Sequence, residues 1–242
     1  MLKNSKKPQK SKKFNTKKHS TKRPFRFNAL DWLCIIIGVI ASVLTVFADQ
    51  NHSPAYITVS IFMLNCGILE AILGIRGRRS NYVFTFICAL ASINIAWIEQ
   101  FYGNMAINLY FIPLSILGFC SWGKHSDKNK NVIARKLTTQ QIIIALVVFA
   151  TATIGLNLIL QHFGGDLTVL DSIATIMIIY ASILGVLRYR EQWLAWIVAD
   201  TIALIMWLDT QSPAVLTMRV FFVFSSIYGY INWRRLIKKP RK

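Results

Sequence analysis

The stretch Asn108-Leu-Tyr-Phe-Ile-Pro-Leu-Ser-Ile-Leu-Gly-Phe-Cys-Ser-Trp122 has a counterpart 111 residues later, Arg219-Val-Phe-Phe-Val-Phe-Ser-Ser-Ile-Tyr-Gly-Tyr-Ile-Asn-Trp233. Residues 60–124 can be laid over residues 171–235 at this constant shift without a gap. Identical residues then coincide in Gly74 with Gly185, Arg79 with Arg190, Gln100 with Gln211, Ser115 with Ser226, and Trp122 with Trp233. Because weak internal repeats in apolar chains are typical of transporters that bind solute between the halves, the repeat favours a membrane transporter.

The composition agrees with a chain that lies in a bilayer. Hydrophobic residues make up 54% of the sequence and charged residues only 16%, and the apolar residues form long runs. Eight such runs are roughly 17 to 22 residues long, enough to cross a hydrocarbon core about 30 Å thick. We therefore predict an all-α membrane protein with eight transmembrane helices. They are expected at Ala29 to Ala48, Ala55 to Ile75, Tyr82 to Ile98, Met105 to Trp122, Gln141 to Gln161, Leu170 to Leu187, Trp193 to Leu208 and Ala214 to Trp233.

The repeat divides the predicted transmembrane domain, residues 28–238. The first repeat covers about 55–124, a linker helix about 141–161, and the second repeat about 167–235. Corresponding helices are four crossings apart, so they run in the same direction across the membrane. The expected core is a three-plus-one-plus-three arrangement of parallel repeats about an axis along the membrane normal, and the first helix is peripheral to it.

Lys and Arg are confined to one side of the predicted membrane. With eight crossings, the connections 49–54, 99–104, 162–168 and 209–213 share the other side and contain no Lys or Arg. The positive-inside bias then places both termini in the cytoplasm. Residues 1–27 form a basic tail, with eleven Lys and Arg before residue 27, which we predict to be disordered and to contact anionic lipid rather than nucleic acid.

Two predicted helices present polar and aromatic side chains along one face. In the seventh segment, Trp193, Trp196 and Asp200 follow three- and four-residue steps, and the fourth segment repeats that pattern. Indole faces attract cations and amides bind hydroxyl groups, so a cavity lined by them suits a flat, polar, cationic solute. The predicted substrate-binding residues are Asn94, Trp97, Gln100, Asn104, Asn108, Phe111, Ser115, Trp193, Trp196 and Asp200.

Structural interpretations compete with several of these functional ones. A carboxylate in the middle of a membrane segment is functional by default, but Asp200 could instead form an ion pair with Arg219. Glu70 lies near the cytoplasmic end of its segment and is interpreted as interfacial. An interfacial position is the structural alternative for three tryptophans, Trp122, Trp193 and Trp233. Helix packing is the structural interpretation of Asn65, Ser92 and Asn157.

Known catalytic and cofactor patterns are missing from the sequence. The four cysteines fall in different predicted helices, the four histidines lie outside the segments, and no metal-ligand spacing connects them. There is no nucleotide-binding Gly-rich loop, zinc-protease motif or serine elbow. We expect neither an enzyme nor an ATP-driven pump, and no cofactor or metal.

The chain resembles the PnuC family of vitamin transporters over about residues 30–238. The resemblance rests on Tyr102-Gly-Asn-Met105, Asn108-Leu-Tyr-Phe-Ile-Pro113, the Gly118 to Trp122 spacing, Asp171-Ser172, and Arg190-Glu-Gln-Trp193-Leu-Ala-Trp196-Ile-Val-Ala-Asp200. It implies uptake of nicotinamide riboside for NAD biosynthesis in the bacterial inner membrane, on a core similar to the SWEET sugar transporters. It also implies energy-independent uniport, with the vitamin trapped through phosphorylation by a cytoplasmic kinase.

Two positions differ from what this resemblance leads us to expect. Asp200 stands where an Asn is expected, and Ser115 where Gln or Asn is common. Nicotinamide riboside carries a pyridinium cation, which suits an added carboxylate, but thiamine is also cationic. Thiamine or another vitamin therefore remains an alternative substrate, a membrane-embedded enzyme or receptor subunit a second alternative, and a homo-oligomer an open question.

Overall fold

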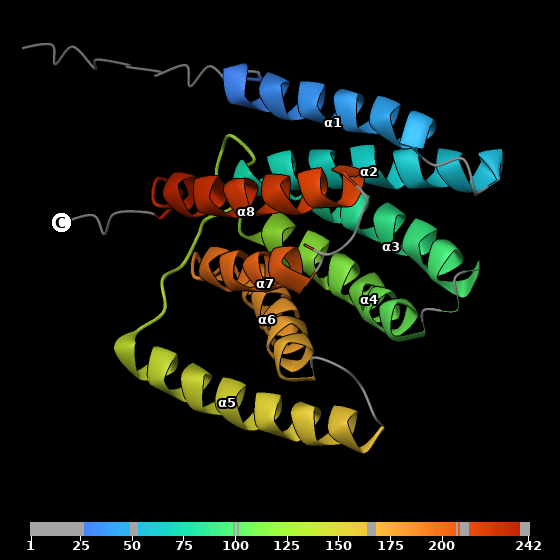
Figure 1. Cartoon of the computed structure of the whole chain (residues 1–242). Coiled ribbons are helices and arrows are strands. Elements are labelled where there is room, and N and C mark those ends of the chain that lie inside the picture. Colours follow the sequence, from blue (N-terminus) through green and yellow to red (C-terminus); the bar gives the residue numbers. More distant parts are fainter. Residues whose placement is uncertain are drawn as a thin grey trace, which may run out of the picture.

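The computed structural model describes residues 27–48, 53–98, 100, 102–163, 168–206, 208 and 213–237. Within these residues the chain forms eight helices, and every helix begins and ends within three residues of its predicted bounds. The all-α prediction is therefore confirmed. The helices are α1 (Ala29–Ala48), α2 (Pro54–Ile75), α3 (Asn81–Ile98), α4 (Tyr102–Lys124), α5 (Thr139–His162), α6 (Thr168–Val186), α7 (Gln192–Met206) and α8 (Pro213–Trp233) (Figure 1).

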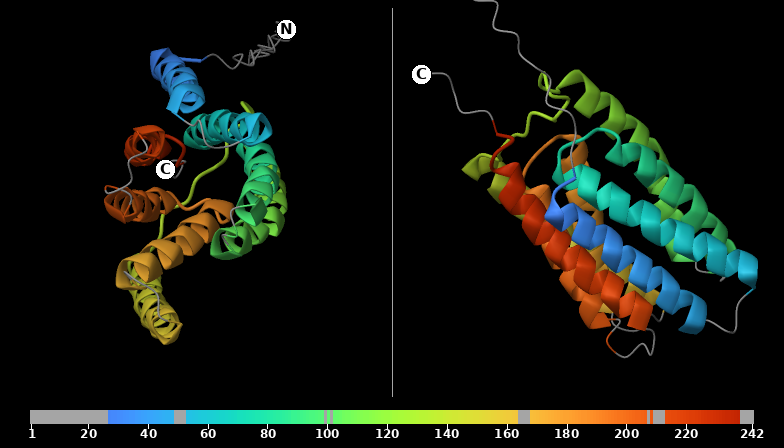
Figure 2. Two further views of the ribbon diagram at one scale, coloured as in Figure 1. Left: turned by 45° about the vertical axis from the view of Figure 1, so that its right-hand side comes forward. Right: turned by 90° about the horizontal axis from the view of Figure 1, so that it is seen from above.

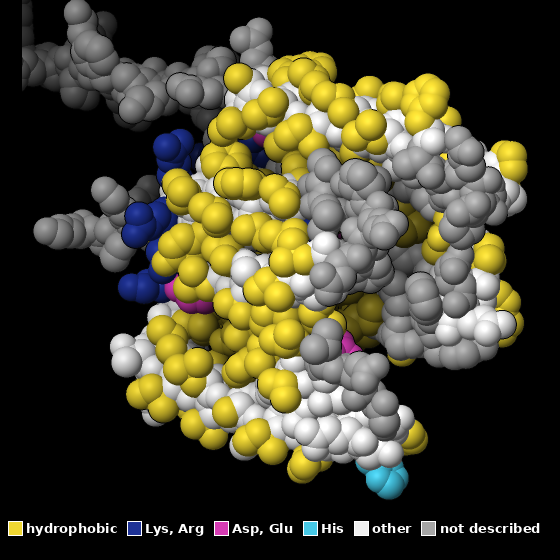
Figure 3. Space-filling model, in the orientation of Figure 1, with side chains coloured by type: hydrophobic (Ala, Val, Ile, Leu, Met, Phe, Trp, Pro, Cys, Tyr) yellow, Lys and Arg dark blue, Asp and Glu magenta, His cyan; other side chains and the backbone are white. Residues whose placement is uncertain are grey.

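Six of these helices, α1 to α6, are long and apolar enough to cross a membrane within the part of the chain that is described. Of the other two, α7 has only 15 residues, and α8 is not among the spans found in the described residues, so eight crossings stay a prediction. On the face shown in Figure 3, apolar side chains cover the flanks of the helices, and Lys and Arg side chains gather at one end. This distribution is what a lipid-facing belt with one basic surface requires.

The helices pack as two groups of three. In each group the middle helix contacts both others, so α2–α3–α4 and α6–α7–α8 are built alike, and the groups meet where α2 contacts α8 and α4 contacts α6. Among the described helices, α1 contacts only α2 and α8, and α5 contacts only α6. Figures 1 and 2 accordingly show α1 and α5 at opposite edges of the molecule.

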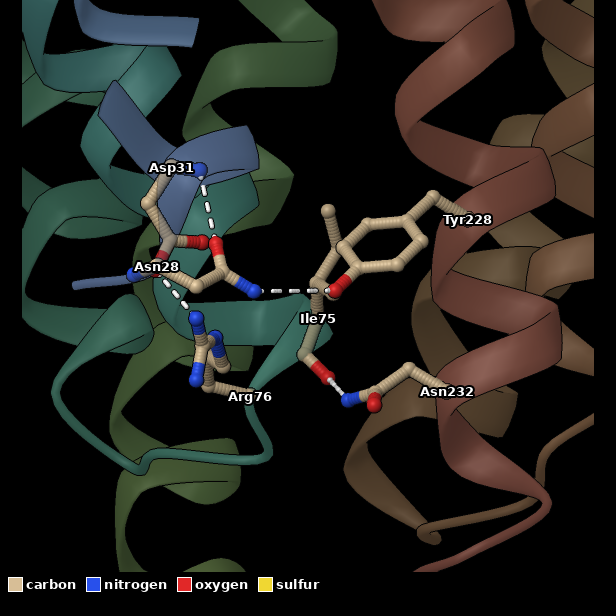
Figure 4. A network of polar contacts seen from close by, with 6 residues as sticks. All are labelled: Asn28, Asp31, Ile75, Arg76, Tyr228 and Asn232. Atoms are coloured by element: carbon tan, nitrogen blue, oxygen red, sulfur yellow. Dashed lines mark hydrogen bonds and ion pairs between the residues drawn. The ribbon is translucent and has the colours of Figure 1, made fainter. Parts of the chain in front are cut away.

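The start of α1 is fixed by polar contacts at the basic end of the molecule (Figure 4). The Asn28 and Asp31 side chains each accept the other residue's backbone N–H, at 2.9 and 2.8 Å, which caps the helix. The Asp31 carboxylate also pairs with the Arg76 guanidinium, and the Asn28 amide donates to the Tyr228 hydroxyl at 3.4 Å. Because Arg76 follows α2 and Tyr228 lies on α8, these contacts attach α1 to both groups of helices.

The turns that follow α2 and α6 have the same backbone geometry. Gly77 and Arg188 are 111 residues apart and have left-handed φ values of 65° and 67°. Each turn is closed by a 2.9 Å hydrogen bond, from Arg78 N–H to the Leu73 carbonyl and from Tyr189 N–H to the Leu184 carbonyl. This is the usual left-handed ending of a helix, where glycine is favoured and arginine is strained.

The connection between α4 and α5 runs across both turns. Val132 donates its N–H to the Gly77 carbonyl at 2.8 Å, and Arg135 donates to the Arg188 carbonyl at 2.7 Å. Arg190 returns a hydrogen bond to the Arg135 carbonyl at 3.0 Å. One extended segment thus holds together the basic ends of the two helix groups.

The two groups exchange matching hydrogen bonds. Trp122 on α4 donates its indole N–H to the Gly185 carbonyl at 2.8 Å, and Trp233 on α8 donates to the Gly74 carbonyl at 3.0 Å. Both donors and both acceptors are related by the 111-residue shift. Trp122 and Trp233 are 1% and 0% exposed, so the interfacial interpretation of these two side chains is wrong.

Candidate substrate-binding cavity

A cavity of about 320 Å³ lies between the two groups of helices. This volume falls at the lower end of the range of about 300–1,000 Å³ that is typical of small-molecule sites. Of the 27 described residues that line it, 24 form twelve pairs at the 111-residue shift. The pairs are Gly67 with Ile178, Ala71 with Ser182, Gly74 with Gly185, Asn81 with Gln192, Tyr82 with Trp193, Thr85 with Trp196, Cys88 with Ala199, Ala89 with Asp200, Asn108 with Arg219, Phe111 with Phe222, Leu114 with Ser225, and Ser115 with Ser226.

The pairing of positions does not extend to their chemistry. Asp200 corresponds to Ala89, and Arg219 to Asn108, so both charges of these pairs come from the second group. Glu70 also lines the cavity, but the corresponding Ala181 does not. The walls are therefore symmetric in position and asymmetric in charge, which suits a solute with two different ends.

Six of the ten predicted site residues line the cavity. They are Asn108, Phe111, Ser115, Trp193, Trp196 and Asp200. The Asn104 side chain lies outside the described residues. The other three predicted residues, Asn94, Trp97 and Gln100, are exposed and do not line the cavity.

Helix geometry explains why Asn94 lies elsewhere. The cavity face of α3 passes through Thr85, Cys88 and Ala89, in steps of three and four residues. Asn94 is five residues beyond Ala89, which turns it away from that face. Trp97 is 66% exposed at the far end of the helix. The residues that correspond to the α7 face at the 111-residue shift lie in the first half of α3 instead.

Asp200 has two neighbours within the cavity wall. Ser226 on α8 donates its hydroxyl to Asp200 Oδ2 at 3.0 Å, and the Arg219 guanidinium lies near enough to attract the carboxylate. The sequence offered an interaction with Arg219 as the structural alternative to a binding role for Asp200. Both side chains line the cavity.

Other polar groups in the cavity were not predicted from the sequence. Glu70, interpreted as interfacial, is half-buried and accepts a hydrogen bond from the Thr85 hydroxyl at 2.7 Å. Asn81 and Gln192 are buried at corresponding positions, and Asn81 Oδ1 and Gln192 Nε2 have no hydrogen-bond partner within the described structure. Buried polar atoms without partners are rare, so these amides fit a ligand. The 111-residue shift relates Asn81 to Gln192, so the sequence contained a signal that could have identified this pair.

Asn65 has a structural role in helix packing. The Asn65 amide donates to the Ser42 hydroxyl at 2.9 Å and to the Ile61 carbonyl at 2.8 Å. The first bond joins α2 to α1, which is the helix-packing role predicted for Asn65.

The comparisons with known proteins agree with one another. A family described as nicotinamide mononucleotide transporter matches residues 57–235. The chain is similar to a curated nicotinamide riboside transporter PnuC of Haemophilus influenzae, with 37% identity over 72% of this chain and 77% of that protein. A nicotinamide riboside transporter PnuC of Neisseria mucosa is 31% identical over 86% of this chain and 81% of the other.

A solved structure shares the fold. The crystal structure of the vitamin B3 transporter PnuC aligns with a TM-score of 0.73 at 28% identity, covering 88% of this chain and 93% of that one.

Proposed function

Because this chain belongs to the PnuC family of transporters, we propose that it carries nicotinamide riboside across the bacterial plasma membrane. The family consists of transporters, so the prediction that the chain is not an enzyme is confirmed. The substrate proposal rests on one observation of this structure, the charge of the cavity between the two helix groups.

Among its described lining residues, the cavity has two carboxylates, Glu70 and Asp200, and one guanidinium, Arg219. When all three are ionised, the net charge of the walls is −1. Nicotinamide riboside is a monocation through its pyridinium ring, so this charge favours it. The phosphorylated form carries a net negative charge at neutral pH and is repelled, which matches retention of the phosphorylated product inside the cell.

The lining side chains suggest roles for each part of the substrate. Trp196 offers an indole face on which the heteroaromatic ring stacks. Asp200, already hydrogen-bonded to Ser226, accepts a ribose hydroxyl. Asn81 and Gln192 supply the unpartnered amide atoms that the carboxamide of nicotinamide needs. The remaining predicted residues of the cavity, Asn108, Phe111, Ser115 and Trp193, enclose the substrate.

The transport mechanism proposed is uniport by alternating access. The two groups of three helices, with α5 as linker and α1 peripheral, act as parallel repeats that rock about the cavity. The paired cavity positions and the exchanged Trp122–Gly185 and Trp233–Gly74 hydrogen bonds support that arrangement. Net uptake then depends on a cytoplasmic kinase that phosphorylates the substrate. The basic end of the molecule, with both chain termini, faces the cytoplasm.

Thiamine is the second candidate substrate. It is also a monocation, through its aromatic thiazolium ring, so the net charge of the cavity favours it equally. Competition between the two vitamins for the purified protein separates the proposals.

Uptake into liposomes tests the function directly. Purified protein should equilibrate labelled nicotinamide riboside across the membrane without concentrating it. Accumulation should appear when a riboside kinase and ATP are enclosed. Accumulation without kinase that follows a proton or sodium gradient would exclude uniport, and inhibition by thiamine but not by unlabelled nicotinamide riboside would exclude the substrate.

A further inference from the structure

Glu70 is a carboxylate on the wall of the cavity. It lies on the α2 face formed by Gly67, Ala71 and Gly74, at steps of three and four residues, and all four residues line the cavity. The other cavity-lining residues of this face are glycines and an alanine, so they leave space for a solute beside Glu70. Glu70 therefore reaches the cavity from the opposite helix group to Asp200.

The two carboxylates differ in their surroundings. Asp200 is attracted by Arg219 and accepts a hydrogen bond from Ser226. Glu70 accepts a hydrogen bond from the Thr85 hydroxyl at 2.7 Å, and no Lys or Arg of the described chain forms an ion pair with it. A carboxylate withdrawn from water needs a compensating charge. Arg219 supplies it at Asp200, whereas no Lys or Arg of the described residues supplies it at Glu70.

The position of Thr85 relates Glu70 to the proposed stacking residue. Thr85 and Trp196 correspond at the 111-residue shift, and both line the cavity. They therefore have equivalent positions in the two helix groups, on opposite walls of the cavity. A planar ring on Trp196 then presents its other face toward the wall that carries Thr85 and Glu70. We propose that Glu70, oriented by Thr85, is the residue that selects the positive ring of the substrate.

This inference rests on the proposed function, and it assigns a different role to each of the two carboxylates. Glu70 distinguishes a charged ring from an uncharged ring, while Asp200 and Arg219 form a locally neutral pair that contacts the polar part of the substrate. Selectivity for a cation is thereby assigned to a residue outside the Trp-x-x-Trp stretch of α7.

The test compares two ligands of almost the same shape. Nicotinamide riboside has a charged ring, and its dihydro form, reduced by hydride addition, has an uncharged ring. In calorimetric titrations of the full-length protein, Glu70→Gln should weaken binding of the charged form about tenfold or more, because a charge-assisted contact is lost. Binding of the dihydro form should change less than about twofold, since a neutral contact contributes little.

Two further variants keep the result interpretable. Glu70→Asp retains the charge and should retain most of the preference for the charged ring, even if Glu70→Gln folds poorly. Asp171→Asn is the matched control, because Asp171 accepts a hydrogen bond from Thr175 at 3.4 Å on α6 but does not line the cavity. It should alter binding of neither riboside.

The outcomes separate this inference from the proposed function. Equal losses for both ribosides in Glu70→Gln, or no loss for either, overturn the role of Glu70. If the wild-type protein binds neither riboside, the substrate proposal fails, and the same comparison is made with thiamine and its uncharged analogue 3-deazathiamine. A protein that binds no member of either pair selects no cationic ring, which overturns both.

Discussion

The indole rings of Trp122 and Trp233 contact each other at a centroid distance of 5.4 Å, although they lie 111 residues apart. Each ring also meets an aromatic partner of its own group edge-on, Tyr82 for Trp122 at 5.0 Å and Trp193 for Trp233 at 5.9 Å. Each indole donates to a carbonyl of the opposite group. The two tryptophans thus join the two helix groups at the basic end of the cavity.

Replacing either tryptophan by phenylalanine should destabilise the protein to a similar degree. Trp122→Phe removes the indole donor to the Gly185 carbonyl, and Trp233→Phe removes the indole donor to the Gly74 carbonyl, so each carbonyl keeps only the backbone N–H of its turn. The expected loss is about 1–2 kcal/mol each, or roughly 2–4 °C per kcal/mol in the unfolding temperature for a chain of this size, measured by thermal unfolding in detergent. Trp97→Phe is the control, because Trp97 is 66% exposed. An unfolding temperature that falls for only one of the two buried tryptophans contradicts the matched roles.

Two glycines at corresponding positions allow the aromatic rings to approach the helices. A Cβ at Gly118 would lie 2.2 Å from the Tyr82 ring, and one at Gly229 would lie 2.4 Å from the Trp193 ring. Gly118→Ala and Gly229→Ala should each destabilise the protein by about 1–3 kcal/mol through overpacking. Gly155→Ala on α5 has nothing within 4 Å and should be neutral or stabilising by up to about 1 kcal/mol. Similar unfolding temperatures for all three variants would show that the rings can move aside.

The left-handed turn after α6 contains a removable strain. Arg188 has a φ of 67°, where the corresponding Gly77 has 65°, and a side chain in this region costs about 1–2 kcal/mol. Burial is the main cause that lowers the pKa of Arg188, and repulsion from Arg135 is the second. The charge of Arg188 is therefore unfavourable in addition to its strained backbone. Arg188→Gly should raise the unfolding temperature. Arg188→Ala removes the charge but keeps the strained backbone, so it should give a smaller gain, and equal gains would assign the whole effect to the charge.

The sequence predicted the helices well because apolar runs of membrane length are bounded by clear polar connections. α1 was expected at Ala29 to Ala48 and has those bounds. The site was predicted only in part. Trp196 and Asp200 were found through their spacing, but Glu70 was missed because depth along a helix cannot be judged from sequence when the cavity reaches toward one end. Asn94 was included because polarity alone does not indicate which face a helix buries.

Labelling of single cysteines tests the orientation of the chain. In a background without the four native cysteines, Gln100→Cys and Phe163→Cys should react with an impermeant reagent from outside, since both positions are exposed between helices at the end away from the basic turns. Asn129→Cys, exposed in the connection between α4 and α5, should react only after the cells are permeabilised. Reaction of Asn129→Cys in intact cells contradicts a cytoplasmic basic surface.

The charge of the cavity can be altered in both directions at the Asp200–Arg219 pair. Asp200→Asn removes the carboxylate that attracts Arg219 and changes the net charge of the described walls from −1 to 0, so binding of the riboside cation should weaken, by about tenfold if the charge-assisted contact to the ribose hydroxyl is lost. Arg219→Asn introduces the residue of the corresponding position, Asn108, and makes the net charge −2, so cation binding should strengthen. The double variant returns the net charge to −1 and should bind more nearly like the wild type. These affinities are measured by calorimetry at low salt, where charge effects are least screened. If both single variants shift the affinity in the same direction, the pair acts by shaping the cavity, and its charge does not govern binding.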